Sequence, residues 1–356
     1  MELHETEGLW ERLSRETRPV VLYGMGDGAE KILTLCRKFG VAVQAIFASD
    51  EFVRGQIFAG FPVMTYRQVC AKYERPIILV SFGTEKPEVL EHIYAIAEEQ
   101  EVLAPDVPLF GDEVFDMKGF RAREKEIETV YGKLADDASR QVFSSLLNYK
   151  LSGKVEYLRQ MESAREEVFR TVFSFSDEEV YVDLGAYDGD TITEFLQWTN
   201  GAYRKILALE PDRKNFVKLK RRFPEAERQR MQLLPYASWK EKTELVFDGR
   251  GGRNSALGEG KKAYRVEAQT VDDLLQGEVG SYIKMDVEGA ERETLLGCKK
   301  TMAAFAPKLA VSAYHRTWDF VDLPLLIWKL NPAYRIFLRH HPYIPAWETN
   351  LYAVKE

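Results

Sequence analysis

Two runs of apolar, β-prone residues each end in a glycine-containing turn that leads into a helical pattern. The first is PVVLYG at residues 19–24, followed by MGDGAE and by KILTLCRKFG, which stops at Gly40. The second is EVYVDLG at residues 179–185, followed by AYDGDTITEFLQWT. A strand, a glycine turn and a helix in this order begin a nucleotide-binding parallel sheet. We therefore expect two α/β domains.

Length and the remaining patterns set the expected domain boundaries. A chain of 356 residues is too long for one typical core. We predict a Rossmann-like α/β domain at residues 1–115, a helical connector at 116–178 that packs on the second domain, and a second α/β domain at 179–356. In the second domain, five strands alternate with helices and a terminal strand pair follows. This pattern predicts a doubly wound, mostly parallel sheet with one reversed edge strand. Two segments near residues 243–249 and 264–270 are predicted to form a hairpin.

Composition excludes several classes of protein. The net charge of −7 disfavours a general nucleic-acid or anionic-membrane surface. The three cysteines are far apart, so neither a zinc knuckle nor a disulfide scaffold is indicated. The polar, acidic first residues do not form a signal peptide, and no apolar run approaches the length of a membrane span. We expect a cytoplasmic protein.

The second glycine turn does not fit a dinucleotide. Where a GxGxxG fingerprint has its middle glycine, this turn has Tyr187, which would crowd a pyrophosphate. Asp183, Asp188 and Asp190 would also place carboxylates near the phosphates, and like charges repel. S-adenosylmethionine has no phosphate and carries a sulfonium and an ammonium, which favour nearby carboxylates. The turn therefore predicts S-adenosylmethionine as the ligand.

The next two strands supply further cofactor contacts. Glu210 ends the second strand, 27 residues after Asp183, where a carboxylate can accept hydrogen bonds from both ribose hydroxyls. The third strand is predicted to end in Tyr236-Ala237-Ser238, beside the adenine. In the alternative interpretation, the acidic residues only cap helices and face solvent, and Asp190 is an N-cap.

Several motifs in a fixed order resemble the FkbM-type methyltransferases, which use S-adenosylmethionine. They cover roughly residues 165–356 and read VDLGAYDGDT, ALEPD, TVDDLL, IKMDVEGAE, SAYHRTWD and LRHH…WETNLYA. The resemblance implies a class I methyltransferase fold and methylation of a hydroxyl, often on a sugar or polyketide. The full predicted cofactor-binding set is Asp183, Gly185, Ala186, Tyr187, Gly189, Asp190, Thr191, Glu210, Pro211, Ala237, Ser238 and Asp286. The first domain is similar to the small Rossmann-like domain of sugar- and polysaccharide-modifying enzymes, through VVLYGMGDGAEKIL and GFPVMTY.

Three residues near predicted strand ends are candidates for proton transfer. Asp286 ends one strand, His315 ends the next, and His340 lies near the end of a later strand. Histidine titrates near neutral pH and suits a general base. An alternative is a divalent cation held by Asp286, Glu288, Glu291 and His315. We favour helix N-terminal charge for the two glutamates and predict no metal.

Other features are open to two interpretations. Trp318, Trp347 and Tyr314 would suit a sugar ring but are equally typical of a core. The loop that contains Arg250, Arg253, Lys261 and Lys262 would either close over an anionic acceptor or form an exposed hairpin tip.

Three functions therefore remain in view. The leading prediction is O-methylation of a sugar, glycan or other small hydroxyl acceptor, with N-methylation left open and a homodimer allowed. An oxidoreductase that binds NAD or a sugar nucleotide at Gly24–Ala29, with Asp50 on the ribose, is one alternative. A non-catalytic cofactor-binding protein is the other.

Overall fold

The computed structural model describes residues 1–355 except 227–229, 249–255 and 258–262. Contacts divide the chain into two units. The first unit contains Met1–Gly132, Asp136–Ser163 and Arg339–Thr349; the second contains Lys133–Ala135, Ala164–Leu338 and Asn350–Glu356. This division differs from the predicted boundaries, because most of the helical segment joins the first unit instead of packing on the second. The segment Arg339–Thr349, far along the chain, also joins it.

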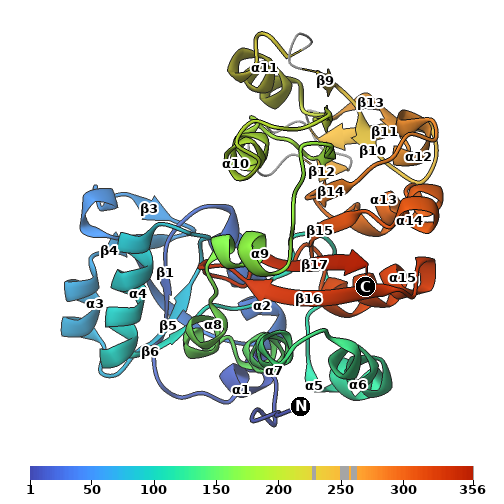
Figure 1. Cartoon of the computed structure of the whole chain (residues 1–356). Helices are drawn as coiled ribbons and strands as arrows, with labels where there is room; N and C mark the ends of the chain where they lie inside the picture. Colours follow the sequence, from blue (N-terminus) through green and yellow to red (C-terminus); the bar gives the residue numbers. More distant parts are fainter. Residues whose placement is uncertain (227–229, 249–255, 258–262, 356) are drawn as a thin grey trace. The chain divides into compact units, whose positions relative to one another are not determined.

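A six-stranded sheet forms the core of the first unit (Figure 1). Its strands are β1 (Val20–Tyr23), β2 (Val43–Phe47), β3 (Ile57–Phe58), β4 (Phe61–Met64), β5 (Ile77–Val80) and β6 (Glu101–Leu103), and its helices are α1 (Leu9–Ser14), α2 (Asp27–Phe39), the 3-10 turn η1 (Asp50–Phe52), α3 (Tyr66–Lys72) and α4 (Pro87–Glu99). The strand order is β3-β4-β2-β1-β5-β6. β1 pairs in parallel with both β2 and β5. The first predicted strand is therefore central and fully buried, which explains its unbroken apolar run.

Short helices occupy most of residues 117–171. They are α5 (Met117–Ala122), α6 (Glu124–Lys133), α7 (Asp137–Ser152), α8 (Val155–Met161) and α9 (Arg165–Thr171). The predicted amphipathic helix through Val130 and Leu146 is in fact two helices. Asp136 begins the second of them, because its side chain accepts a hydrogen bond of 2.8 Å from the Ser139 N–H. Gly153 ends it in the left-handed region, as predicted.

A seven-stranded sheet forms the core of the second unit. Its strands are β7 (Val180–Leu184), β8 (Lys205–Leu209), β9 (Met231–Leu234), β14 (Tyr282–Met285), β15 (Lys308–Ser312), β16 (Tyr334–His340) and β17 (Thr349–Lys355), and its helices are α10 (Asp190–Trp198), α11 (Arg213–Arg222), α12 (Val271–Leu275), α13 (Glu291–Leu296), α14 (Lys299–Phe305) and α15 (Asp319–Leu330). The strand order is β16-β17-β15-β14-β7-β8-β9. β7 pairs in parallel with β8 and β14, so the chain progresses outward from β7 in both directions. Such a switch point places a ligand crevice at the carboxyl ends of β7 and β14.

Two details of the predicted second sheet are wrong. The reversed strand is β17, which pairs antiparallel with β15 and lies inside the sheet, whereas β16 takes the edge. The predicted third strand stops at Leu234 with β9. Ala237–Ser238 instead form β10, which belongs to a small sheet with β11 (Thr243–Asp248), β12 (Ala256–Leu257) and β13 (Ala263–Gln269). The predicted hairpin is confirmed by the antiparallel pairing of β11 with β13.

Among the described residues, no helix combines the length and apolarity that crossing a membrane requires.

Candidate functional site

The backbone N–H groups of the turn after β7 donate hydrogen bonds to acceptors within the protein. The N–H groups of Gly185 and Ala186 donate to the Leu209 carbonyl at 3.0 and 2.9 Å. The N–H of Tyr187 donates to Glu210 Oε2 at 2.8 Å, and that of Gly189 donates to the Ala186 carbonyl at 2.7 Å. A phosphate cradle needs such groups free to point at the ligand. This turn is therefore not built to hold a phosphate.

The two glycines of the turn are required by packing. Gly185 has φ +80°, and a Cβ there would lie 1.9 Å from the Asp286 carbonyl oxygen, so the loops after β7 and β14 touch. Gly189 has φ +90° and precedes α10; a Cβ there would lie 2.5 Å from the Phe223 ring. Gly189 thus gives α11 its close approach, whereas the sequence suggested close approach of a ligand.

The acidic residues of the turn have different partners. Asp188 pairs with Arg222 at 2.9 Å, so its charge is neutralised within the protein. Asp190 is exposed at the first position of α10 and accepts from the Thr191 N–H, while Gly189 takes the N-cap position that the alternative interpretation assigned to Asp190. Thr191 Oγ1 donates to Asp183 Oδ2 at 2.6 Å.

Asp183 is fully buried and has a buried cation beside it. Lys284 Nζ lies 3.4 Å from Asp183 Oδ1 and donates to the Gly185 carbonyl at 2.8 Å. Burial alone would lower the pKa of Lys284, but Asp183 and Asp286 raise it above its ordinary value. Asp183 therefore holds the turn in place through Thr191 and Lys284.

Glu210 lies where the sequence places it, directly after β8. Its side chain is 5% exposed, and its two oxygens accept from the N–H groups of Tyr187 and Asp212, each at 2.8 Å. Burial raises the pKa of Glu210 to about 7, against the lowering effect of these two hydrogen bonds. Each carboxylate oxygen keeps a second acceptor position. Such a group can bind a vicinal diol.

The predicted adenine contacts are less well placed. Ser238 is buried, and its Oγ lies 2.9 Å from Thr294 Oγ1, so the hydroxyl already has a partner. Ala237 is buried in β10, which is not one of the strands of the seven-stranded sheet. The Pro211 carbonyl, just beyond Glu210, accepts from the Tyr264 hydroxyl at 3.3 Å.

Three carboxylates surround His315 at the carboxyl ends of β14 and β15. His315 is 1% exposed, and its Nδ1 lies 2.9 Å from Glu291 Oε1. Its Nε2 lies 3.4 Å from Asp286 Oδ1 and 3.5 Å from Glu288 Oε2. The structure thus brings together the two predicted catalytic residues Asp286 and His315 with the two glutamates.

The electrostatics of this cluster do not suit His315 as a general base. Burial lowers the pKa of His315, but Glu291, Glu288 and Asp286 raise it to about 10. The imidazole therefore carries its proton at neutral pH and cannot accept another, contrary to the role predicted from the sequence. Burial alone would raise the pKa of Asp286, but the opposing effect of Lys284 and His315 is larger. The pKa of Asp286 therefore lies below its ordinary value, and the carboxylate is ionised.

His340 belongs to the first unit, whereas Asp286 and His315 belong to the second. It is fully buried, and its Nδ1 lies 3.0 Å from Thr349 Oγ1. Burial is the main cause that lowers the pKa of His340 to about 3, and the neighbouring His341 contributes to the same effect. A neutral, enclosed imidazole of this kind indicates a structural role, in place of the proton transfer predicted for His340 from the sequence.

The three aromatic residues considered for a sugar site lie in different surroundings. Tyr314 remains at the cluster, with its hydroxyl 3.5 Å from Asp286 Oδ1. Trp318 is buried against Phe320, with ring centroids 6.2 Å apart, and belongs to the core. Trp347 is in the first unit, where a Cβ on Gly83 would lie 2.4 Å from its ring. Arg250, Arg253, Lys261 and Lys262 lie outside the described residues.

The glycine turn of the first unit is likewise explained by packing. A Cβ on Gly28 would lie 2.2 Å from the Ser81 carbonyl oxygen, and one on Gly24 would lie 2.5 Å from the Phe82 ring. Both glycines therefore bring the turn close to the end of β5. No contact of this turn favours a nucleotide over a structural role.

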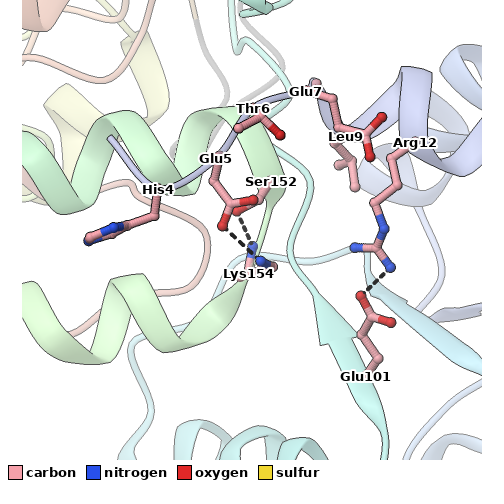
Figure 2. A pocket seen from close by; sticks show the side chains of 10 residues that line it. His4, Glu5, Thr6, Glu7, Leu9, Arg12, Glu101, Ser152 and Lys154 are labelled. Carbon is pink, nitrogen blue, oxygen red and sulfur yellow. Dashed lines mark hydrogen bonds and ion pairs between the residues drawn. The ribbon is translucent and has the colours of Figure 1, made fainter. Parts of the chain in front are cut away.

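A cavity of about 320 Å³ lies in the first unit near the N-terminal segment (Figure 2). Lys154 Nζ donates to Glu5 at 2.7 Å, and Arg12 pairs with Glu101. Figure 2 shows both pairs between residues that line the cavity. Because these charges satisfy one another, the cavity has no marked preference for a charged ligand.

Sequence reasoning places Lys284 beside Asp286 but misses the two other partners that fix the site. Three contacts limit the ligands that the site can bind: Asp188 pairs with Arg222, Ser238 contacts Thr294, and Asp183 pairs with Lys284. Of these three partners, only Lys284 can be inferred from the sequence, because it lies two residues before Asp286 on the same face of a strand. The other two are brought in by α11 and α13.

Comparisons with known proteins agree with this geometry. Residues 183–345 match the family model described as the Methyltransferase FkbM domain. Methyltransferase FkbM from Methylobacillus flagellatus is similar in structure, with 22% identity, a TM-score of 0.74, and coverage of 98% of this chain and 94% of that chain. This likeness confirms the predicted fold class.

Two further solved structures are similar over about half of the chain. They are an rRNA methylase from Streptococcus thermophilus, with 15% identity, a TM-score of 0.32 and coverage of 51% of this chain and 88% of that chain, and a precorrin-6y C5,15-methyltransferase from Geobacter metallireducens, with 12% identity, a TM-score of 0.35 and coverage of 56% of this chain and 91% of that chain. At these TM-scores they add nothing to the assignment. No curated protein sequence matches the chain.

Proposed function

We propose that the chain is an FkbM-type methyltransferase that transfers a methyl group from S-adenosylmethionine to a hydroxyl of a sugar or glycan, because residues 183–345 match the FkbM methyltransferase domain on a class I methyltransferase fold. The observation that carries the choice of cofactor is the buried carboxylate of Glu210. It stands at the end of β8, beside a turn whose N–H groups are already used within the protein. Together they suit a nucleoside whose ribose needs acceptors and which brings no phosphate.

The residues present fit this cofactor. Glu210 would accept hydrogen bonds from the two ribose hydroxyls with its free acceptor positions. The carboxylates of Asp286 and Glu291 outnumber the one imidazole between them, whereas burial raises the pKa of Glu288 to about 8 and keeps that side chain mostly neutral near pH 7. That excess of negative charge favours a cationic ligand near the carboxyl ends of β7 and β14. S-adenosylmethionine, when bound, supplies an electrophilic methyl group on a positively charged sulfur.

The protein's part in the reaction is to align the acceptor and to take its proton. The acceptor oxygen forms a bond to the methyl carbon as the carbon–sulfur bond breaks, so the three atoms must lie in line. We assign Asp286 as the group that accepts the hydroxyl proton, because it is ionised and its side chain is 33% exposed, whereas His315 already carries a proton. Tyr314, whose hydroxyl lies near Asp286, would help to orient that carboxylate.

Calorimetry with S-adenosylhomocysteine tests the cofactor assignment. We expect the full chain to bind it, and Glu210→Ala to weaken binding at least about tenfold, a loss of about 1.4 kcal/mol. Glu178→Ala is the matched control, because Glu178 is an exposed glutamate of the same unit. No binding by the unmodified protein would refute the cofactor. Equal binding by the Glu210→Ala protein would refute the role of Glu210.

The acceptor requires a separate experiment. Mass spectrometry of glycans from cells with and without the gene should show the loss of one methyl group, and NMR of the affected glycan should place that methyl on oxygen. A methyl on nitrogen would contradict the proposed acceptor chemistry and leave the cofactor assignment intact.

A further inference from the structure

The cluster around His315 holds more negative charge than its histidine can neutralise. Asp286, Glu288 and Glu291 each place an oxygen within 3.5 Å of an imidazole nitrogen. The neighbouring cation Lys284 is 3.4 Å from Asp183 and is directed to the Gly185 carbonyl. Two of these carboxylates, Asp286 and Glu291, lie beside one imidazole in a largely buried place, and buried negative charge is costly unless a cation balances it.

Glu291 gives an independent indication that this cluster can hold a cation. It is 1% exposed, and its Oε1 is held by the N–H groups of Val287 and Gly289 at 3.0 and 3.4 Å. Its other oxygen, Oε2, is buried and has no hydrogen-bond partner among the residues that the structure describes. Buried carboxylate oxygens are normally satisfied. Because Oε1 is 2.9 Å from His315 Nδ1, the carboxylate faces the imidazole and not the solvent.

The spacing suits a small divalent cation. Asp286, Glu291 and His315 each offer one ligand atom, and these atoms all lie within 4.8 Å of one another. Two ligands at about 2.1 Å from an ion are at most about 4.2 Å apart, so side-chain movements of well under about 1 Å would close the set. Glu288, with Oε2 3.5 Å from His315 Nε2, is a further carboxylate within reach.

We propose that Asp286, Glu291 and His315 form a binding site for a divalent first-row transition metal ion. Two carboxylates with one imidazole suit Mn²⁺, Fe²⁺ or Zn²⁺ better than Mg²⁺, which prefers oxygen ligands alone. The ion would take the place of the proton that His315 carries without it. The sequence favoured helix N-terminal charge for Glu291. Its burial and its contact with His315 now favour the ion. Because Asp286 offers the ion one oxygen, its other oxygen would still accept the hydroxyl proton. The use of that ion to polarise the acceptor hydroxyl rests on the proposed function, but the binding of the ion does not.

The test measures Mn²⁺ binding to the full chain after treatment with EDTA, by electron paramagnetic resonance. We expect one Mn²⁺ per chain, with affinity lowered about tenfold to hundredfold in Glu291→Gln and in His315→Gln. Asp188→Asn is the matched control, because Asp188 is an acid of the same unit that pairs with Arg222 outside the cluster. Circular dichroism and thermal unfolding of each variant establish that it is folded.

The outcomes separate this proposal from the proposed function. Saturable Mn²⁺ binding that is lost in both cluster variants and kept in Asp188→Asn supports the site. Failure of Mn²⁺, Fe²⁺ and Zn²⁺ to bind, or equal binding in folded variants, overturns it. S-adenosylhomocysteine binding, measured on the same metal-free samples, reports on the cofactor alone. A protein that binds the cofactor but no metal therefore refutes only the metal site.

Discussion

At the scale of single residues, the turn after β7 acts mainly through its backbone. Its N–H groups bond to the Leu209 carbonyl, to Glu210 and to the Ala186 carbonyl, which ties β7 to the end of β8. This arrangement requires one close approach, in which Gly185 lies against the Asp286 carbonyl. The same residue therefore sets the distance between the two loops that flank the expected cofactor.

Substitution of Gly185 tests this directly. Gly185→Ala would place a Cβ 1.9 Å from a backbone oxygen at φ +80°, and we expect a loss of about 3 kcal/mol or more in the free energy of unfolding. Gly201→Ala is the control: its φ is +73°, but nothing lies within 4 Å of an added Cβ, so only about 1 kcal/mol should be lost. Urea unfolding measures both. Equal losses would show that backbone conformation alone matters.

At the scale of elements, the two ends of the central strands have different tasks. The carboxyl ends of β7 and β14 carry the acidic cluster and the turn. The opposite end is fixed by Glu179, which is 2% exposed. Glu179 accepts from the Ser176 N–H at 3.0 Å, from the Ser281 hydroxyl, and from Lys308 Nζ at 2.7 Å, and so connects the start of β7 with β14 and β15.

This division of tasks predicts stability effects without loss of ligand binding. Glu179→Gln leaves Lys308 without its buried partner, and we expect about 3 kcal/mol of destabilisation. Glu278→Gln breaks an ion pair of 3.0 Å to Lys205 whose glutamate is 52% exposed, and should cost less than about 1 kcal/mol. Both folded variants should bind S-adenosylhomocysteine as the unmodified protein does. Weakened binding in Glu179→Gln alone would contradict this separation of the strand ends.

Sequence patterns predicted elements better than their arrangement. Buried runs such as Val20–Tyr23 and Val180–Leu184 are apolar throughout, and a strand is their natural conformation. The position of β17 between β15 and β16 depends on pairing between distant segments, which local periodicity does not record. The site shows the same limit. Glu210 was predictable as the end of a strand, but the protonation of His315 depends on carboxylates delivered by a neighbouring loop and helix.

At the scale of the whole molecule, the chain returns to its first unit after building most of the second. The segment Arg339–Thr349 belongs with the first unit, where the Ser163 N–H donates to the His340 carbonyl at 2.9 Å and the Thr84 N–H donates to the Ile344 carbonyl at 2.8 Å. The buried His340 therefore reports on the integrity of the first unit.

His340 predicts how stability depends on pH. Its folded pKa is about 3, against about 6.5 for an unfolded histidine. Above pH 6.5 both states are neutral at this residue. As the pH falls from 6.5 toward 3, only the unfolded state takes up the proton, so stability falls by about 1.4 kcal/mol per pH unit. Urea unfolding between pH 7 and pH 5 should show a shallower loss in His340→Asn. Parallel pH profiles for the two proteins would contradict this account.

The return of residues 339–349 to the first unit also has a consequence for biosynthesis. A ribosome delivers residues 1–163 early, yet the contacts that Ser163 and Thr84 make with His340 and Ile344 cannot form until those two residues have left the exit tunnel. Neither unit can therefore be completed early, because the first needs Arg339–Thr349 and the second needs Asn350–Glu356. Until then, the face of the first unit that receives the segment is open to solvent and to chaperones.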